Sequence, residues 1–264
     1  MSVVIAFLIV GILGLILGFG LAIADKKLAV EKDPKLVALE EAMPGANCGG
    51  CGFAGCQAYA EAVFKGTAAP GLCSPGGEVL AKKMGEILGV EVEVKERMTA
   101  FVFCRGGSDV TKTDYLYKGM TDCNAASLLQ GGPVGCKEGC LHLGSCISVC
   151  PVGAISRDEK GDIVVDKERC IACGKCVSVC PNHVIKMIPY SLEWVCACNN
   201  HEPGGKVRKT CQVGCIGCKM CETKVEGSPF AVEAFLSAND WNKDQSTAEK
   251  AADICPQKCI VRRS

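Results

Sequence analysis

The chain has 264 residues, of which 29 are basic and 29 acidic, so its formal net charge is +0. This balance provides no basic surface for nucleic acid, and we expect no nucleic-acid partner. Aromatic residues make up only 5% of the chain and the 48% hydrophobic fraction includes 22 cysteines, so we expect several small domains held by bound metal instead of one large apolar core.

The chain begins with an apolar segment that carries no charge up to Ala24. A helix of roughly 20 such residues crosses the hydrocarbon core of a bilayer. A cleaved signal peptide is the competing interpretation, because Ala22-Ile23-Ala24 resembles a cleavage site, but no basic residue precedes the run. Lysines follow the run, which places the remainder of the chain in the cytoplasm by the positive-inside rule. We therefore predict a single-pass protein of the cell (inner) membrane, with its transmembrane helix over residues 1–24 and a charged linker over residues 25–35.

A first cysteine set lies within residues 36–90, which we predict to form a small helical domain. Its spacing is C-x2-C-x4-C-x16-C, and its members are Cys48, Cys51, Cys56 and Cys73. Glycines between these cysteines let the backbone pass close to a bulky anionic cluster. Helices are expected over residues 58–64 and 78–88. We predict that the four thiolates bind one 4Fe-4S cluster.

Residues 91–190 are predicted to form a bacterial two-cluster ferredoxin module. Strand-like alternation over residues 91–104 marks its start, and short apolar runs at 154–155 and 163–165 surround two cysteine runs. The second run has the spacing C-x2-C-x2-C-x3-C-P, in which the fourth cysteine ligates the other cluster. This crossing rule predicts two ligand sets, namely Cys136, Cys140 and Cys146 with Cys180, and Cys170, Cys173 and Cys176 with Cys150.

Disulfide bonds and structural zinc are the alternatives for so many cysteines. Disulfides need an oxidising compartment, and nothing in their chemistry selects three cysteines at steps of three followed by Cys-Pro. Structural zinc prefers two separated C-x2-C pairs that close one tetrahedron, so we consider it chiefly for cysteines outside the runs. The spacing therefore favours iron-sulfur clusters.

Residues 191–264 repeat cysteines of the preceding module at an offset of 75 residues. The repeated positions are Cys123, Cys136, Cys140, Cys146 and Cys180, which recur as Cys198, Cys211, Cys215, Cys221 and Cys255. The same shift places other residue types opposite all four ligands of the second cluster, so we predict a degenerate ferredoxin-like module that retains one cluster. The predicted ligands are Cys215, Cys218, Cys221 and Cys255, with Cys211 as the alternative to Cys218.

Five cysteines remain unassigned, either as free thiols or as members of a further site. They are Cys104, Cys123, Cys196, Cys198 and Cys259. The predicted fold class is thus α+β, a small multi-domain iron-sulfur protein with at least four 4Fe-4S clusters. Its parts are an N-terminal transmembrane helix, a helical four-cysteine domain, a two-cluster ferredoxin module and a degenerate second module.

In this order of parts the chain resembles the B subunit of the Rnf electron-transport complex, a membrane-bound ferredoxin:NAD oxidoreductase that translocates ions. The segment C-G-G-C-G-F-A-G-C at 48–56, with Cys73 and the ferredoxin module after it, carries the resemblance. The sequence GCKEGCLHLGSCISVCPVGAI resembles the longer, anaerobe-type members. The missing ligands in the last module and Cys259 depart from the family pattern, which affects the cluster count but not the role.

The resemblance implies that reduced soluble ferredoxin docks on the cytoplasmic part and that electrons pass through the clusters to the membrane. The implied partners are soluble ferredoxin, the membrane, the membrane-embedded cluster- and flavin-carrying Rnf subunits, and an NAD-binding subunit. NAD reduction and Na+ or H+ translocation are expected on those subunits. No catalytic residue and no complete active site are predicted on this chain.

Two other functions compete with this one. The chain could be a polyferredoxin component of another membrane oxidoreductase, such as a hydrogenase or formate complex, or its clusters could serve a structural scaffold. A plain polyferredoxin needs neither the four-cysteine domain nor the membrane helix, so their direct fusion favours the Rnf interpretation. Clusters that do not cycle reversibly in a redox titration would indicate the scaffold.

Overall fold

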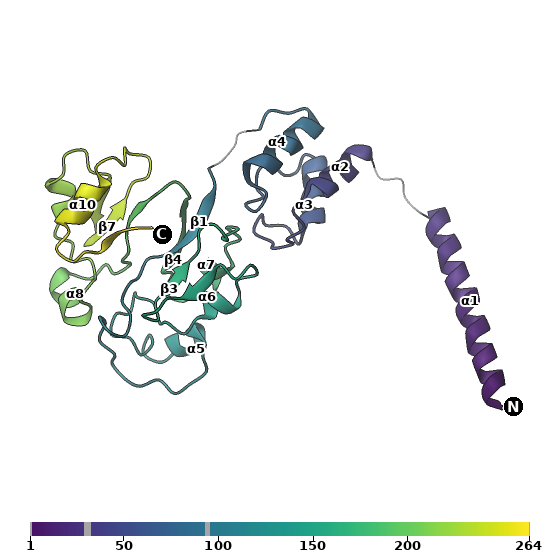
Figure 1. The fold of residues 1–264 in the computed structure, drawn as a ribbon, viewed down its shortest axis with the longest axis horizontal. Coiled ribbons are helices and arrows are strands. Elements are labelled where there is room, and N and C mark those ends of the chain that lie inside the picture. The colour runs from purple at the N-terminus through teal and green to yellow at the C-terminus, as the bar shows by residue number, and fades with distance from the viewer. Residues whose placement is uncertain (1, 29–32, 93–95, 264) are drawn as a thin grey trace.

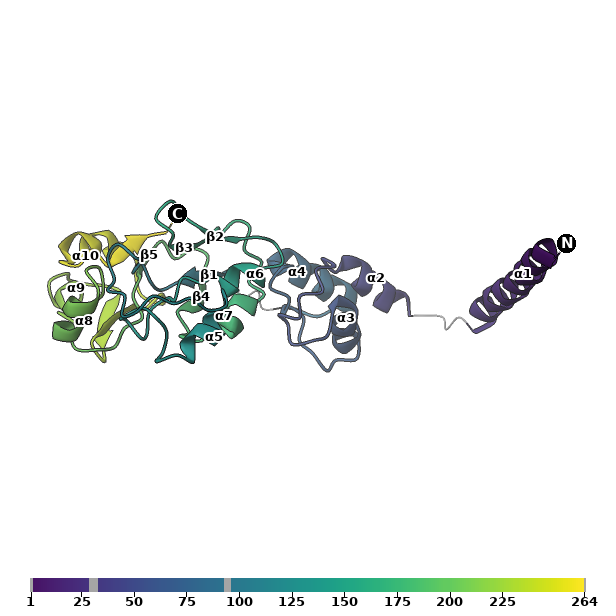
Figure 2. The same cartoon turned by 90° about the horizontal axis from the view of Figure 1, so that it is seen from below.

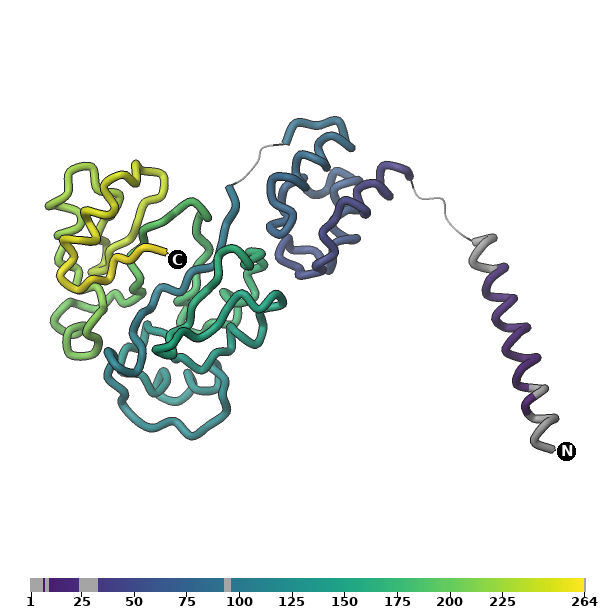
Figure 3. Tube along the Cα trace, in the orientation of Figure 1, coloured from purple at the N-terminus to yellow at the C-terminus, as the bar shows by residue number. Residues whose placement is uncertain are grey.

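The computed structural model describes residues 2–28, 33–92 and 96–263, and within the first helix it describes the side chains of Phe7 and residues 10–23. The first helix stands apart at one end of the molecule, and three helices follow it (Figures 1 and 2). The short strands and helices of the remaining chain form the other end, where the trace folds back on itself repeatedly (Figure 3). The protein is therefore a small protein of mixed helix and strand.

The first helix, α1, spans Ser2–Leu28 and so continues into the predicted linker. Among the residues that the structure describes, no helix combines the length and the apolar character needed to cross a membrane. Part of the predicted transmembrane segment, residues 1–6, 8, 9 and 24, lies outside the residues whose side chains are described. Residues 29–32 of the predicted linker also lie outside the described residues.

Three helices form what we call the N-terminal helical unit, residues 33–92. They are α2 (Pro34–Ala42), α3 (Cys56–Phe64) and α4 (Gly77–Leu88). The helices predicted over 58–64 and 78–88 are confirmed, with α3 beginning two residues earlier and α4 one residue earlier than predicted. Leu39, Tyr59 and Met84, one from each helix, are almost fully buried in one core. Gly89 ends α4 in the left-handed conformation that glycine adopts at little cost.

Within the described residues, every sheet consists of two antiparallel strands. The pairs are β1 (Met98–Val102) with β4 (Ile185–Pro189), β2 (Ile155–Arg157) with β3 (Ile163–Val165), β5 (Trp194–Cys196) with β8 (Ile260–Arg262), and β6 (Phe230–Glu233) with β7 (Leu236–Asn239). The first pair places Ala100 opposite Met187. β1 is shorter than the strand pattern at 91–104 predicts, and residues 93–95 of that stretch lie outside the described residues.

Short helices connect these strand pairs. They are α5 (Cys123–Ser127), α6 (Ser145–Ser148), α7 (Lys175–Val179), α8 (Gly204–Thr210), α9 (Met220–Thr223) and α10 (Ala248–Ile254). One core gathers around β1 to β4 and a second around β5 to β8, and both contain cysteines among their buried residues. Isolated helices and hairpins of this length are marginal in water, so bound metal is expected to stabilise both cores.

Arg263 joins the C-terminal strand to the first core. Its side chain is buried and donates hydrogen bonds of 2.9 Å to the carbonyl oxygens of Pro189 and Leu192. A buried guanidinium needs such partners, because an unsatisfied one would be costly. Burial also lowers the pKa of Arg263 from its ordinary value. This contact fixes the C-terminal segment against β4.

Candidate iron-sulfur sites

The N-terminal cysteine set gathers at the start of α3 and before α4. Cys56 is the first residue of α3, and its backbone N–H donates to the side-chain oxygen of Asn47 at 2.8 Å. The Tyr59 hydroxyl accepts a 3.0 Å hydrogen bond from the N–H of Leu72, which holds the loop next to Cys73. Burial raises the pKa of Cys73, and the charges of Cys56, Cys51 and Cys48 add to the shift. The four sulfurs are therefore electrostatic neighbours.

The loop of this set touches the ferredoxin module. A Cβ atom added at Gly50 would lie 3.1 Å from both the Cα and the carbonyl oxygen of Cys173. That is tighter than nine in ten real Cβ contacts, so a side chain at this position would require the two backbones to move apart by a few tenths of an ångström. The Cys48–Cys56 loop thus packs directly on the loop that carries a predicted ligand of another cluster.

A cavity in the ferredoxin module is lined by Cys150, Cys170, Cys173 and Cys176. The backbone N–H of Ala154 donates to Cys150 Sγ at 3.2 Å, and that of Ala100 donates to Cys170 Sγ at 3.4 Å. Burial raises the pKa of Cys176 to about 12, and Cys170 and Cys173 add to the shift. Burial thus favours the neutral thiol of Cys176, whereas a bound metal ion would favour its thiolate.

Cys140, Cys146 and Cys180 lie near one another in the same core. Burial raises the pKa of Cys146 to about 11, and the charges of Cys123 and Cys180 contribute next. Burial also raises the pKa of Cys140, with further contributions from Cys104, Cys146 and Cys123. Cys123, which the sequence pattern leaves unassigned, is therefore a neighbour of both Cys140 and Cys146.

Asp122 holds Cys123 in this position. Its carboxylate accepts hydrogen bonds from the N–H of Ala125 at 2.8 Å, as the N-cap of α5, and from Ser145 Oγ at 2.9 Å. The Ser145 hydroxyl in turn accepts the N–H of Cys123 at 2.7 Å. These hydrogen bonds lower the pKa of Asp122, so it stays ionised. The start of α5 is thereby attached to the start of α6.

Cys136 faces a different cavity from the one expected for it. This cavity is lined by Cys104, Cys198 and Cys211 as well, with Cys140 on its wall. Of the predicted ligand set, Cys140, Cys146 and Cys180 therefore lie in one core, whereas Cys136 lines this second cavity. The spacing C-x3-C between Cys136 and Cys140, which departs from C-x2-C, was the one local signal of this difference.

The predicted C-terminal ligands line one cavity, together with Cys259. They are Cys215, Cys218, Cys221 and Cys255, of which only Cys218 is exposed. Cys221 Sγ lies 3.3 Å from Ser237 Oγ. Cys211, the alternative to Cys218, lies at the other cavity.

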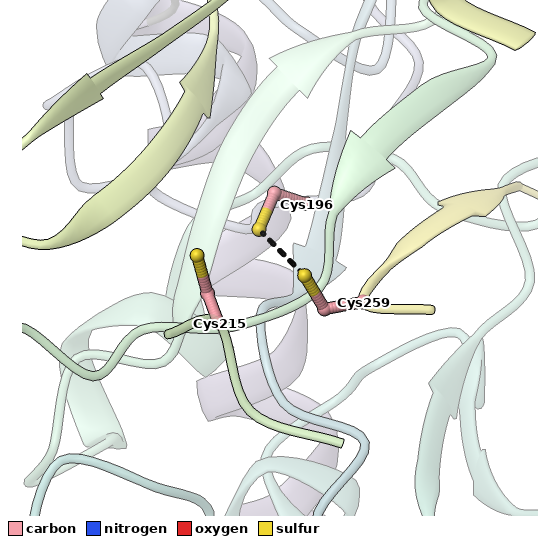
Figure 4. Close-up of side chains that lie close together, drawn as sticks. All are labelled: Cys196, Cys215 and Cys259. Atoms are coloured by element: carbon pink, nitrogen blue, oxygen red, sulfur yellow. Dashed lines mark hydrogen bonds between the residues drawn. The ribbon is translucent and has the colours of Figure 1, made fainter. Parts of the chain in front are cut away.

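Cys196 and Cys259 lie beside this set. Figure 4 shows Cys196 and Cys259 facing each other with Cys215 beside them, and the three sulfurs lie within 4.8 Å of one another. Cys196 Sγ is 3.7 Å from Cys259 Sγ, which is 3.4 Å from Cys255 Sγ. The hydrogen bond with Cys259 lowers the pKa of Cys255 to about 5, and the one with Cys196 lowers the pKa of Cys215. Cys196 and Cys259, whose pKa values are raised, can therefore act as neutral S–H donors to two thiolates.

The spread of the sulfurs distinguishes cluster sites from single-ion sites. Zn–S bonds of about 2.3 Å place the sulfurs of a zinc tetrahedron about 3.8 Å apart. Within the described residues, Cys196, Cys215 and Cys259 are the only set of three or more potential ligands whose atoms all lie within 4.8 Å of one another. Within the described residues, no three of the cysteines that line the Cys150–Cys176 cavity have sulfurs that close together, which disfavours a single ion there.

Comparisons with known proteins agree with this chemistry. Residues 43–75 match the family model described as "Putative Fe-S cluster", and residues 134–184 match the model described as "4Fe-4S dicluster domain". The B subunit of an ion-translocating oxidoreductase complex from Methanosarcina acetivorans is 40% identical over 251 residues, which cover 95% of each chain.

Two further relatives are similar over nearly the whole chain. The B subunit of a proton-translocating ferredoxin:NAD(+) oxidoreductase complex from Clostridium ljungdahlii is 38% identical, covering 98% of this chain and 90% of that protein. The B subunit of a Na(+)-translocating complex of the same type from Acetobacterium woodii is 38% identical, covering 96% of this chain and 75% of that protein.

Proposed function

The chain belongs to the family of B subunits of ion-translocating oxidoreductase complexes, and from that premise we propose that it is the membrane-anchored electron-transfer subunit of an Rnf-type ferredoxin:NAD oxidoreductase. It accepts electrons from reduced ferredoxin and passes them to membrane-embedded redox subunits. The transfer is coupled to NAD reduction and to translocation of Na+ or H+ on other subunits. The names of two relatives, which specify ferredoxin, NAD and an ion, support this proposal.

The observation that carries the proposal within this chain is the grouping of its cysteines. Four sets are proposed as ligands of four 4Fe-4S clusters. They are Cys48, Cys51, Cys56 and Cys73; Cys150, Cys170, Cys173 and Cys176; Cys215, Cys218, Cys221 and Cys255; and Cys140, Cys146 and Cys180 with Cys123 in place of Cys136. The corresponding units are residues 36–90, 91–190 and 191–264.

Bound 4Fe-4S clusters supply one-electron chemistry at potentials set by charge, hydrogen bonds to sulfur and exposure. The chain's own residues control all three factors. Backbone N–H groups such as those of Ala100 and Ala154 donate to ligand sulfurs and stabilise negative charge on them. Exposure differs among the proposed ligands, since Cys176 and Cys221 are buried whereas Cys218 is exposed. The chain therefore positions and tunes electron carriers and leaves the NAD chemistry to its partners.

The order of transfer is proposed from the packing of Gly50 on Cys173. This contact makes the N-terminal helical unit the neighbour of the Cys150–Cys176 site. The unit is also adjacent in sequence to α1. We therefore place the entry of electrons in the ferredoxin module and their exit at the Cys48–Cys73 set.

Residues 1–24 are proposed as the membrane anchor, with the bulk of the chain on the cytoplasmic side. Support comes from the absence of charge up to Ala24 and from the lysines that follow it. Such an anchor keeps the exit site next to membrane-embedded partners.

Reduction by ferredoxin tests the proposed function directly. Anaerobic addition of reduced ferredoxin to the purified full chain is expected to bleach its visible iron-sulfur absorbance reversibly. A chain that carries its clusters but is not reduced by ferredoxin would contradict the proposal and favour a polyferredoxin of another membrane oxidoreductase, or a scaffold.

Gly50→Ala is expected to slow electron transfer into the N-terminal cluster without loss of iron. The added methyl group must push away the backbone of Cys173, and tunnelling weakens steeply with distance. Freeze-quench EPR after mixing with reduced ferredoxin measures the rate. Gly205→Ala is the matched control, because a Cβ at Gly205 meets open space. An unchanged rate in Gly50→Ala would remove this contact from the transfer route.

Cys259→Ala is expected to leave the iron content unchanged and to lower one cluster potential. The substitution removes an S–H donor 3.4 Å from Cys255 Sγ. A hydrogen bond worth about 1 kcal/mol corresponds to a shift of about 40 mV for a one-electron couple. An EPR-monitored redox titration measures it. Loss of a whole cluster, as expected for Cys255→Ala, would instead make Cys259 a ligand.

A further inference from the structure

A cavity between the two cores contains four cysteines that the proposed clusters leave unused. These are Cys104, Cys136, Cys198 and Cys211. Cys136, Cys198 and Cys211 are buried and Cys104 is partly buried. The four thiols come from four separate segments, so no local spacing motif connects them.

Backbone pairing holds these segments in place. Thr111 and Cys211 form an isolated antiparallel bridge, reinforced by hydrogen bonds of 2.8 Å from Lys112 N to Thr210 O and from Gln212 N to Val110 O. The N–H of Gly135, beside Cys136, donates to Lys112 O at 2.7 Å. Two of the four thiols are thereby anchored to one short stretch of chain.

Each of the four sulfurs accepts a hydrogen bond from a separate donor. Asn200 Nδ2 donates to Cys136 Sγ at 3.1 Å, and Thr111 Oγ1 donates to Cys211 Sγ at 3.4 Å. The other two donors are backbone groups, Gly106 N to Cys104 Sγ at 3.4 Å and Cys215 N to Cys198 Sγ at 3.3 Å. A neutral thiol is a weak acceptor, whereas a thiolate accepts strongly. Four donors on four sulfurs therefore suit four thiolates.

Gly106 makes the cavity possible. A Cβ at this position would lie 3.5 Å from both Cys104 Sγ and Cys211 Sγ and only 2.4 Å from Thr111 Oγ1. A side chain there would therefore displace the hydroxyl that donates to Cys211. The absence of a side chain leaves room beside two of the sulfurs.

Neither a single metal ion nor disulfide bonds match the arrangement of these four cysteines well. All four cysteines are free. Within the described residues, no three of them have sulfurs within 4.8 Å of one another, whereas a zinc tetrahedron requires sulfurs about 3.8 Å apart. Thiolates that surround a cubane stand further apart than those around one ion. Four thiols around one cavity therefore suit a cluster better than a single ion.

We propose that Cys104, Cys136, Cys198 and Cys211 bind a fifth 4Fe-4S cluster, which lies between the two ferredoxin-like halves of the chain. Cys140, a proposed ligand of one neighbouring cluster, lies on the wall of this cavity. Cys215, a proposed ligand of another, donates its N–H to Cys198. The site therefore connects the C-terminal cluster to the ferredoxin module. Only this connecting role rests on the proposed electron-transfer function; the site itself does not.

Metal analysis of the full chain, produced anaerobically with complete cluster assembly, tests the site. The wild-type chain is expected to contain about 20 iron atoms, four for each of five cubanes, and no stoichiometric zinc. Cys104→Ala, Cys211→Ala and the double variant are each expected to contain about 16, because all three lose the same cluster. Val207→Ala, which changes a buried wall of the same cavity, is the control and keeps about 20.

A wild-type content of about 16 iron atoms that the double variant leaves unchanged would overturn the proposal. One zinc per chain that disappears in the double variant would also overturn it. If the cysteine variants fail to fold, Thr111→Val provides a second test. This variant is expected to retain all iron and to lower the reduction potential of the cluster that gives one EPR signal. No shift in any signal would count against the site. Failure of ferredoxin to reduce a chain with about 20 iron atoms would contradict the proposed function but not this site.

Discussion

Replacing Cys51 with alanine is expected to leave the ferredoxin module reducible and to stop electron delivery to the membrane. Cys51 lies in the loop that packs on Cys173, within a helical unit that has its own core. A cubane that loses one thiolate becomes labile, and we expect the damage to stay local because the proposed clusters lie in separate units. Bleaching by reduced ferredoxin should persist, while ferredoxin-dependent NAD reduction in membranes should fall to background.

Cys173→Ala is the matched comparison for this result. Its sulfur belongs to a cavity within the ferredoxin module, whose core also contains Cys140 and Cys146. Slower reduction by ferredoxin is therefore expected, with the EPR signal of the Cys48–Cys73 site still present. If Cys51→Ala abolished reduction by ferredoxin while an artificial donor still supplied the membrane, entry and exit would be reversed.

Local sequence patterns predict the sites whose ligands come from one loop. Cys170, Cys173 and Cys176 follow one another at steps of three, the spacing by which one loop presents three thiolates to a cubane, and all three line one cavity. The helices α3 and α4 were predictable for a similar reason, since their apolar residues recur at helical spacing over two or more turns. In both cases the information lies within a few neighbouring residues.

The cavity of Cys104 and Cys211 could not be predicted in this way. Its four thiols are brought together by long-range backbone pairing, such as the bridge between Thr111 and Cys211. The repeat at an offset of 75 residues relates Cys136 to Cys211, but it does not indicate that both face one cavity. Two cysteines at equivalent positions of a repeat have the same place in each copy, but the repeat does not show whether they lie close together in the folded chain.

The strand pairs of the C-terminal segment escaped prediction for another reason. β5 and β8 have three residues each and come from opposite ends of that segment. A period of two cannot be recognised over three residues, and the partner of each strand is fixed only by the folded chain. Arg263, which joins this region to β4, likewise has partners more than 70 positions away in the sequence.

Deletion of residues 1–24 is expected to abolish membrane NAD reduction while leaving the redox chemistry of the remaining chain intact. The cysteine sets and both cores lie beyond Ala24, so their metal binding does not require the deleted segment. The truncated chain should be a soluble brown protein that ferredoxin still reduces. Activity of membranes that lack the native chain, after addition of the truncated or full chain, measures the loss.

The matched control replaces residues 1–24 with an unrelated single-pass helix of the same orientation. If the segment acts only as an anchor, this chimera should recover membrane delivery, because local concentration at the membrane is restored. If the chimera binds to the membrane but does not deliver electrons, the native helix must also make specific contacts with partner helices. The pair Gly14 and Gly18 has suitable spacing for such contacts. Full activity of the truncated chain without any helix would instead show that contacts of residues 25–264 are sufficient for assembly, and the proposed anchor would be dispensable.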